Sequence, residues 1–177
     1  MKVLAILGSP RKGGNSDILA DEVLRGATEA GAEAEKIYLQ DLCISPCRAC
    51  YGCRGKGKCV QKDDGDYVLE KLIEADTIIL SSPVYFYSIS AQMKIMIDRT
   101  LPRYTEIRGK EFIFILTAAA SKEEIQRALE PLYGFTDCLP SSHVRSVILG
   151  EGVYLKGEVK TTKAMKEAYR AGLNIYL

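Results

Sequence analysis

Short, continuously apolar segments alternate with helix-like patterns along most of this chain, and this alternation is what most constrains its fold. Apolar strands separated by helices imply a parallel sheet with helices packed on both faces. Five such units suit a doubly wound, five-stranded α/β sheet with strand order 2-1-3-4-5. The predicted strands are residues 2–8, 34–39, 77–80, 112–117 and 144–149. The predicted helices are residues 15–31, 66–75, 91–100, 122–132 and 161–173.

The length and charge of the chain indicate its broad class. At 177 residues, one domain over 1–177 is expected, since domains commonly hold about 100–200 residues. Lys plus Arg is 24 and Asp plus Glu is 23, so the net charge favours neither nucleic acid nor a membrane surface as a partner. The N-terminal apolar run, Val3 to Leu7, is too short for a secretory signal, and no run reaches the ~18 apolar residues of a membrane span. A cytoplasmic protein is therefore expected.

A glycine-rich segment, Gly8 to Asp17, joins the first predicted strand to the first predicted helix. The N-terminus of a helix presents unpaired N–H groups and a partial positive charge, so such a turn attracts phosphate. The segment also carries hydroxyl, amide and guanidinium donors for phosphate oxygens. The alternative is a solvated turn with a helix cap at Asn15 or Ser16. The candidate phosphate-binding residues are Ser9, Arg11, Gly14, Asn15 and Ser16.

Three successive aromatic residues follow the third predicted strand, where side chains are expected to be exposed. A turn that begins at Pro83 would leave backbone amides free to meet the polar atoms of a ring system, and the aromatic side chains would supply apolar surface. The alternative for these aromatics is ordinary packing in the core or at an interface. The candidate ring-binding residues are Pro83, Val84, Tyr85, Phe86, Tyr87 and Ser88, with Thr117, Ala118 and Ala119 after the fourth strand as a weaker set.

These two motifs resemble those of the NADPH-dependent FMN reductase family, which has a flavodoxin-like fold. The first segment is similar to the family's phosphate loop, G-S-x-R-x-x-(G)-N-S, and residues 82–94 are similar to the segment that wraps the isoalloxazine ring. The resemblance continues at Ile97-Asp98-Arg99, although ion pairing at a helix end is the first interpretation of Asp98 and Arg99. The resemblance implies that the chain binds FMN, with the phosphate at the first segment and the ring at the second.

A segment without periodicity, residues 42–65, lies between the second predicted strand and the next helix and is rich in cysteine. Four of its thiols are spaced C-x2-C-x2-C-x5-C, a pattern that can wrap a [4Fe–4S] cluster. The alternatives are a zinc site, redox-active thiols or a disulfide, and buried structural cysteines. Cys43 is an additional thiol whose role the sequence does not assign, and Cys138 is expected to be a packing residue. The candidate cluster ligands are Cys47, Cys50, Cys53 and Cys59.

The cysteine pattern extends the resemblance to the iron–sulfur flavoproteins, a subgroup of the same family whose four cysteines match these positions. This resemblance implies a [4Fe–4S] cluster beside FMN, a ferredoxin-type electron donor, and a small acceptor such as oxygen, peroxide or quinone. It also implies a homodimer or homotetramer. Cations interspersed among the cysteines form a basic rim that could steer an acidic partner. They are Arg48, Arg54, Lys56 and Lys58.

Two other interpretations remain open from the sequence. The first is a cluster-free NAD(P)H-dependent FMN or quinone reductase, with the nicotinamide stacked near Tyr85 to Ser88 and the cysteines redox-active or structural. The second is a non-enzymatic flavodoxin-like carrier or a zinc-stabilised binding module. No residue is assigned a catalytic role. The single histidine, His143, has no Ser or Cys motif beside it and is expected at the surface or at a strand end.

Overall fold

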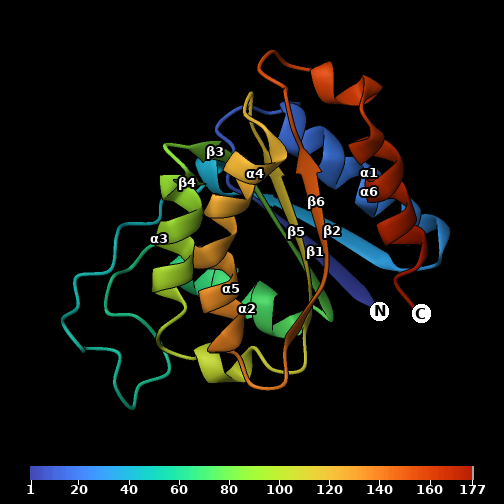
Figure 1. Ribbon diagram of the computed structural model, residues 1–177. Helices are drawn as coiled ribbons and strands as arrows, with labels where there is room; N and C mark the ends of the chain where they lie inside the picture. Colours follow the sequence, from blue (N-terminus) through green and yellow to red (C-terminus); the bar gives the residue numbers. More distant parts are fainter. Residues whose placement is uncertain (177) are drawn as a thin grey trace.

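A parallel β-sheet runs through the centre of the computed structural model, which describes residues 1–176 (Figure 1). Its parallel strands pair in the order β2-β1-β3-β5-β6. Taken alone, these strands follow the order predicted from the sequence, and the α/β class is confirmed. The strands are β1 (Lys2–Leu7), β2 (Glu33–Tyr38), β3 (Thr77–Tyr85), β5 (Glu111–Thr117) and β6 (His143–Gly150).

The sheet differs from the prediction at the carboxyl end of β3. Within residues 1–176 it has six strands rather than five, because the short strand β4 (Ser88–Ile89) pairs antiparallel with the end of β3. The prediction also ended the third strand too early, since β3 continues through Pro83 to Tyr85. Phe86 and Tyr87 form the turn between the two strands, with left-handed φ angles of 50° and 59°. Local sequence did not predict this hairpin because bulky residues rarely adopt left-handed backbone conformations.

Helices cover both faces of the sheet, as expected (Figure 1). One face carries α1 (Asn15–Glu29) and α6 (Lys163–Leu173), whose apolar side chains form one core cluster with the sheet. The other face carries α2 (Gly65–Glu74), α3 (Ala91–Arg99), α4 (Lys122–Gln126) and α5 (Glu130–Asp137). Short 3₁₀ helices occupy Leu39–Asp41, Tyr104–Glu106, Arg127–Leu129 and Glu158–Thr161.

The prediction of one continuous helix over residues 122–132 is wrong. The structure has α4, a 3₁₀ turn at Arg127–Leu129, and then α5, which continues to Asp137. Pro131 explains the break, because it lies in the first turn of α5. Proline is tolerated there, since an N–H in the first turn has no intrahelical acceptor, but it disrupts the interior of a helix.

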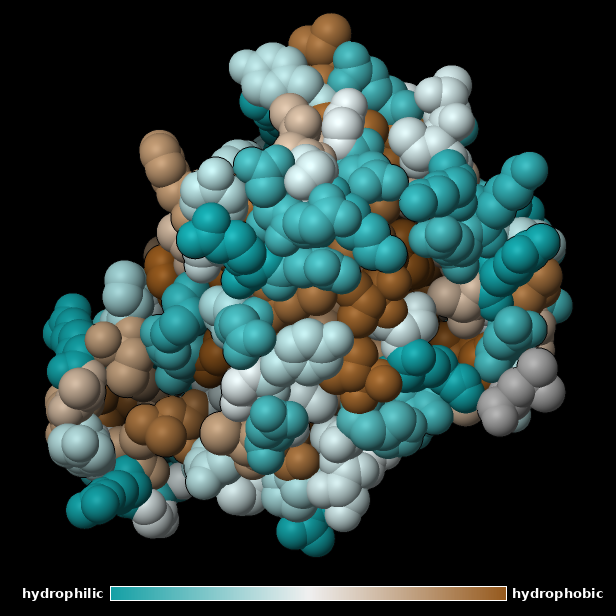
Figure 2. Space-filling model, in the orientation of Figure 1, coloured by the Kyte–Doolittle hydropathy of each residue, from teal (hydrophilic) through white to brown (hydrophobic). Residues whose placement is uncertain are grey.

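The molecular surface on the face shown in Figure 2 is mixed in polarity. Hydrophilic side chains cover most of it, and hydrophobic residues reach the surface in the region where the edge strand β6 lies in Figure 1. Among residues 1–176, no helix combines the length and the apolar composition needed to cross a membrane.

Two glycines allow α1 and α6 to pack with their backbones in contact. A Cβ on Gly172 would lie 2.0 Å from the carbonyl oxygen of Val23, and a Cβ on Gly26 would lie 2.4 Å from that of Tyr169. Both distances are far below van der Waals contact, so neither position accepts a side chain without movement of the backbone. This contact fixes α6 against α1, the helix that follows the candidate phosphate loop.

Replacing Gly172 by alanine is therefore expected to destabilise the fold by forcing α1 and α6 apart. Overpacking of this kind costs about 1–3 kcal/mol, occasionally more. Gly134→Ala is the matched control, because Gly134 lies in α5 with open space around its Cβ position. Alanine should stabilise that helix by about 0.5–1 kcal/mol. Urea denaturation measures both effects, and wild-type stability of Gly172→Ala would contradict the packing argument.

Candidate functional site

The carboxyl ends of β1, β3, β5 and β6 lead into loops that line a cavity of about 250 Å³. The edge where parallel strands end is where ligands bind in this architecture. Most of the lining residues are ones that the sequence analysis named, namely Ser9, Arg11, Gly14, Asn15, Ser16, Pro83, Val84, Tyr85, Thr117, Ala118 and Ala119. The remaining lining residues are Val153, Tyr154 and Lys156.

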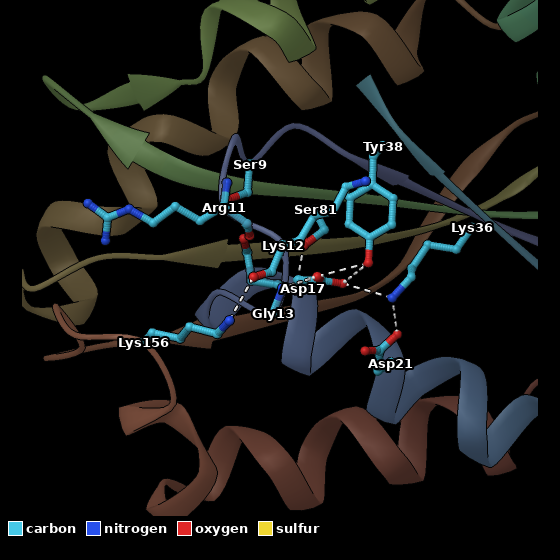
Figure 3. Close-up of polar contacts among 11 residues, drawn as sticks. Ser9, Arg11, Lys12, Gly13, Asp17, Asp21, Lys36, Tyr38, Ser81 and Lys156 are labelled. Atoms are coloured by element: carbon cyan, nitrogen blue, oxygen red, sulfur yellow. Dashed lines mark hydrogen bonds and ion pairs between the residues drawn. The ribbon is translucent and has the colours of Figure 1, made fainter. Parts of the chain in front are cut away.

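A buried carboxylate, Asp17, orders the phosphate loop (Figure 3). Asp17 is 1% exposed and accepts the backbone N–H of Gly13 at 2.6 Å. It also accepts the hydroxyl of Tyr38 at 3.0 Å and the ammonium of Lys36 at 2.9 Å. Burial opposes the charge of Lys36, but hydrogen bonds to Asp21, Tyr38 and Asp17 raise the pKa of Lys36 above its ordinary value. Lys36 compensates the negative charge of Asp17. Asp17 can therefore order the loop with little repulsion of an anion in the cavity.

Two cationic side chains line the cavity, Arg11 from the phosphate loop and Lys156 from the connection after β6. The ammonium of Lys156 donates to the carbonyl oxygen of Lys12 at 3.0 Å, which ties the two loops together (Figure 3). Ser9 accepts the backbone N–H of Arg11 at 3.1 Å. The first N–H groups of α1, which have no intrahelical acceptors, lie in the same loop. This combination of cations and N–H donors suits a phosphate.

Asn15 lines the cavity, but its side chain is engaged elsewhere. Its amide N–H donates to the carbonyl oxygen of Leu155 at 2.9 Å, and its amide oxygen accepts the N–H of Gly157 at 3.0 Å. From the sequence, this amide is expected to donate to a phosphate. In the structure it instead holds the segment around Leu155 against the start of α1.

The structure divides the predicted ring-binding residues into two groups. Val84 and Tyr85 line the cavity, whereas Phe86, Tyr87 and Ser88 lie outside its lining. Phe86 is fully exposed at the tip of the hairpin. The guanidinium of Arg127, in the 3₁₀ turn Arg127–Leu129, lies over the ring of Tyr87, with its carbon 4.1 Å from the ring centroid. The hairpin is the cause, since its turn carries Phe86 and Tyr87 past the end of β3.

Pro83 lies within β3 and pairs with Thr117 of β5. The expectation that Pro83 begins a turn is wrong, because β3 continues to Tyr85 and the turn lies at Phe86 and Tyr87. Beyond β5, Ala118 donates its N–H to Gly150 at 3.1 Å, and Val153 donates to Ala118 at 2.9 Å. The loops after β5 and β6 therefore support each other on one side of the cavity.

The contribution of Val153, Tyr154 and Lys156 was not predicted from the sequence. This segment carries no phosphate or flavin motif, so local patterns gave no signal. The signal that could have found it is topological, because a loop after the last parallel strand reaches the same edge as the other loops. Glu158 helps to fix the segment by accepting the backbone N–H of Tyr154 at 2.6 Å.

The cysteine-rich segment projects from the body of the molecule on the side of α3 (Figure 1). In the part of the chain that the structure describes, residues 42–64 contain neither helix nor strand. Cys47 and Cys50 are exposed and Cys53 and Cys59 half-buried, all as free thiols. Across residues 1–176, no three His, Cys, Asp or Glu side chains converge into a group that could hold a metal ion. The predicted ligands therefore share one loop without being gathered around one point.

Three other residues discussed from the sequence lie at the surface. Cys138 is exposed at the end of α5, so the expectation that it packs inside is wrong. His143 is exposed at the first position of β6 and lies 3.4 Å from Glu111. Asp98 pairs with Lys94 one turn earlier in α3, at 2.6 Å, as its position at a helix end predicts.

Ion pairing and hydrogen bonds close the base of the cysteine-rich segment. The side chain of Asp63, 8% exposed, accepts two hydrogen bonds from the guanidinium of Arg99 at 2.7 Å each. Asp63 also accepts the N–H of Ser45 at 3.0 Å. Asp64 accepts the N–H of Cys43 at 2.7 Å and donates its own N–H to the carbonyl of Cys43 at 3.0 Å. We call these five residues the loop neck, because they hold the two ends of the segment together.

The cavity residues fit FMN. Arg11, Lys156 and the first turn of α1 offer donors and positive charge to a phosphate. Val84 and Tyr85, at the carboxyl end of β3, offer apolar surface to a ring system. A cofactor that carries both a phosphate and an aromatic ring uses both parts of this lining.

The cysteine loop fits a [4Fe–4S] cluster in the type, number and spacing of its donors. Four thiols lie within one loop whose ends are held at the neck. Beside the loop, the buried Nε of Arg99 has no hydrogen-bond partner among residues 1–176. An anionic group bound by the loop would supply the missing acceptor. The thiols must move toward one another to bind such a cluster.

Comparison with known proteins identifies the family. The family model described as NADPH-dependent FMN reductase matches residues 1–150, and the chain therefore belongs to this family of FMN-dependent oxidoreductases. An iron–sulfur flavoprotein of Methanocaldococcus jannaschii is 49% identical over 102 residues, which are 58% of this chain and 53% of the relative. An iron–sulfur flavoprotein of Methanosarcina thermophila is 40% identical over 101 residues, 57% of this chain and 53% of the relative.

The matched segments span about half the length of these relatives. The resemblance to the iron–sulfur flavoproteins within the FMN reductase family is thereby confirmed. A solved structure of an FMN-dependent NADH-azoreductase from Bacillus anthracis, in complex with FMN, has a TM-score of 0.76 at 16% identity and covers 99% of both chains. RosB, with a bound riboflavin-phosphate intermediate, has a TM-score of 0.79 at 15% identity, over 98% of this chain and 76% of that one. These structures confirm the flavodoxin-like fold.

The loop neck is expected to weaken in acid. The hydrogen bonds from Arg99, which outweigh the effect of burial, lower the pKa of Asp63 to about 2. This stabilisation is fully present above the unfolded pKa of ~3.9 and is lost as the pH falls from about 4 toward 2. Its size is on the order of 2 kcal/mol, from ~1.4 kcal/mol per pKa unit.

Asp63→Asn should remove that part of the pH dependence and should lower stability at pH 7 by about 3–5 kcal/mol, because it leaves Arg99 buried without its partner. Asp98→Asn is the control, since its exposed ion pair should change stability by less than about 1 kcal/mol. Urea denaturation between pH 2 and pH 7 measures these effects. The same pH dependence in Asp63→Asn and wild type would refute the assignment.

Proposed function

We propose that this protein is an iron–sulfur flavoprotein that takes electrons from a ferredoxin-type donor and passes them, through a [4Fe–4S] cluster and FMN, to a small acceptor such as oxygen, peroxide or quinone. The two groups supply complementary chemistry, since a cluster moves one electron and a flavin handles one or two. The observation that carries this proposal is the single cavity in which the predicted phosphate-binding residues meet Pro83, Val84 and Tyr85.

The roles of the cavity residues follow from their contacts. Arg11 and Lys156 bind and orient the phosphate through charge-assisted hydrogen bonds. Asp17 keeps the loop in shape through the N–H of Gly13. Tyr85 contacts the ring, with 45% of its surface exposed beside the cavity in the chain alone.

The cysteine loop is the proposed entry point for electrons. Cys47, Cys50, Cys53 and Cys59 would hold the cluster, with the loop neck fixing the position of the loop on the body. The basic rim defined in the sequence is exposed along its whole length. An exposed positive rim favours a donor with an acidic surface and raises the rate of encounter.

A homodimer or homotetramer is proposed as well. Three apolar side chains are exposed close to the cavity segments: Phe86 fully, Tyr154 to 70% and Leu155 to 62%. Exposed apolar surface of this kind is typical of a contact with another protein surface. A second copy of the chain would cover it and shield the cavity from water.

A cluster-free NAD(P)H-dependent FMN or quinone reductase is the second candidate. The observation that favours it is the lack of convergence among metal-ligating side chains within residues 1–176. In this case the nicotinamide would approach the cavity beside Tyr85 and the hairpin, and the cysteines would be redox-active or structural. The iron content of anaerobically prepared protein separates the two candidates.

The cavity assignment predicts selective binding of FMN over riboflavin. Arg11→Met and Lys156→Met should each weaken FMN binding by about 10- to 100-fold, since a hydrogen bond to a charged group contributes about 1.5–3 kcal/mol. Riboflavin binding should change little, because riboflavin lacks the phosphate. Lys160→Met is the control, since Lys160 is exposed and outside the cavity lining. Quenching of flavin fluorescence by the apoprotein measures the affinity of the wild type and of each variant for both flavins. Equal loss of FMN and riboflavin binding would rule out a phosphate role.

The cluster assignment predicts about four irons per chain after anaerobic reconstitution. Cys53→Ser should lose most of this iron, because it removes one of four ligands. Cys43→Ser and Cys138→Ser should retain it, since the backbone of Cys43 belongs to the loop neck and Cys138 lies at the end of α5. Iron determination and the visible absorption spectrum measure the outcome. Iron-free wild-type protein that reduces quinones with NAD(P)H would select the second candidate.

A further inference from the structure

The side chain of Asn15, the first residue of α1, is joined to a segment 140 residues further along the chain. Its amide N–H donates to the carbonyl oxygen of Leu155 at 2.9 Å, and its amide oxygen accepts the N–H groups of Gly157 at 3.0 Å and Val159 at 3.4 Å. Both acceptor positions of the amide oxygen are thereby used. Asn15 is 9% exposed, so water competes little for these bonds.

Lys156 lies between two of the residues that this amide binds. The backbone turns sharply here, since Gly157 has a left-handed φ of 92°. Glu158 completes the turn by accepting the N–H groups of Tyr154 at 2.6 Å and Leu155 at 2.9 Å. The backbone on both sides of Lys156 is therefore fixed.

The side chain of Lys156 carries a positive charge into the lining of the cavity. Its ammonium lies beside the phosphate loop, where it donates to the carbonyl oxygen of Lys12 at 3.0 Å (Figure 3). A Cβ on Gly13 would lie only 2.8 Å from the same nitrogen. A lysine side chain loses much rotamer freedom when it is held in one place. A backbone that is fixed in advance reduces what phosphate binding must still order.

Asn15 couples the two halves of the candidate phosphate site. The N–H groups of the first turn belong to the helix that Asn15 begins, whereas the ammonium of Lys156 belongs to the segment that Asn15 holds. Neither half contains both kinds of donor. Their separation therefore depends on the side chain that joins them.

We propose that Asn15 is a positioning residue for the phosphate of FMN, and that it acts through Lys156 by fixing the backbone from which the ammonium reaches the phosphate. This inference rests on the FMN site of the proposed function. It gives Asn15 a role different from the one expected from its motif, which is direct binding of the phosphate. The residue instead determines where a cation from a distant part of the chain lies.

A double-variant cycle on FMN binding tests the proposal. Asn15→Ala should weaken FMN binding by about 10-fold, as the loss of one charge-assisted hydrogen bond does, and should change riboflavin binding little. In a chain that already carries Lys156→Met, Asn15→Ala should weaken FMN binding by no more than about twofold further, because the ammonium that it positions is gone. A direct bond from the remaining amide N–H of Asn15 to the phosphate would make the two losses additive.

The salt dependence of FMN binding provides a second readout. Lys156 acts through its charge, which salt screens. Asn15→Ala should therefore reduce the salt dependence as Lys156→Met does, although it removes no charge itself. A purely structural role of Asn15 would leave the salt dependence unchanged.

Gly157→Ala displaces the same backbone while leaving Asn15 in the chain, because alanine is strained at a left-handed φ. It should cause the same selective loss of FMN binding. Gly109→Ala is the matched control, since Gly109 also has a left-handed φ, 65°, and open space at its Cβ position, but lies before β5 and outside the cavity lining. Its affinity for FMN should match that of the wild type.

Fluorescence titration of the apoprotein with FMN and with riboflavin measures these affinities. Additive losses, an equal loss of both flavins in Asn15→Ala, or an unchanged salt dependence overturns the role of Asn15 and leaves FMN as the cofactor. If Asn15→Ala does not fold, Gly157→Ala, alone and combined with Lys156→Met, decides the question by the same cycle. Wild-type protein that binds FMN no more tightly than riboflavin overturns the phosphate site of the proposed function as well.

Discussion

Parallel pairing of β1, β3, β5 and β6 places four chain connections at one edge of the sheet, and the candidate site depends on this constraint. None of these loops forms the cavity alone. Each contributes a few residues to a space that exists because the strands end side by side. The register of β3 with β5 sets Pro83 opposite Thr117, so the sheet itself fixes part of the cavity lining. Asn15 then holds the segment after β6 against the start of α1 through its hydrogen bonds to Leu155 and Gly157.

A second part of the molecule, the cysteine loop, is attached through α3. This helix begins after Ser90, whose N–H donates to the hydroxyl of Ser82 at 2.9 Å beside the hairpin, and it ends at Arg99 in the loop neck. Nine residues of helix span roughly 13 Å at 1.5 Å per residue. One rigid element therefore connects the hairpin next to the cavity with the base of the cysteine loop, so the two regions are held at a fixed separation although the loop itself is irregular.

How much of this could be predicted depends on the range of the interactions. The candidate phosphate loop could be located from the sequence because a strand, a glycine-rich turn and a helix follow one another directly, and Ser9, Arg11 and Ser16 all line the cavity. The hydrogen-bond partner of the Asn15 side chain was not predictable, because Leu155 is 140 residues away in the sequence. The hairpin at Phe86 and Tyr87 was also missed, since its left-handed turn opposes the local preference of both residues.

By itself the sequence determined the elements and the candidate chemistry they carry: the apolar strands, the helix that follows a glycine-rich turn suited to phosphate, and four thiols at the spacing of a cluster motif. Tertiary structure decided which side chains meet. It gave Asn15 a tethering role, brought Lys156 to the phosphate loop, and joined Arg99 to Asp63 across the loop neck. The physical reason is that a motif consists of a few adjacent residues, whereas contacts between residues distant in the sequence depend on packing, strand register and the burial of charge.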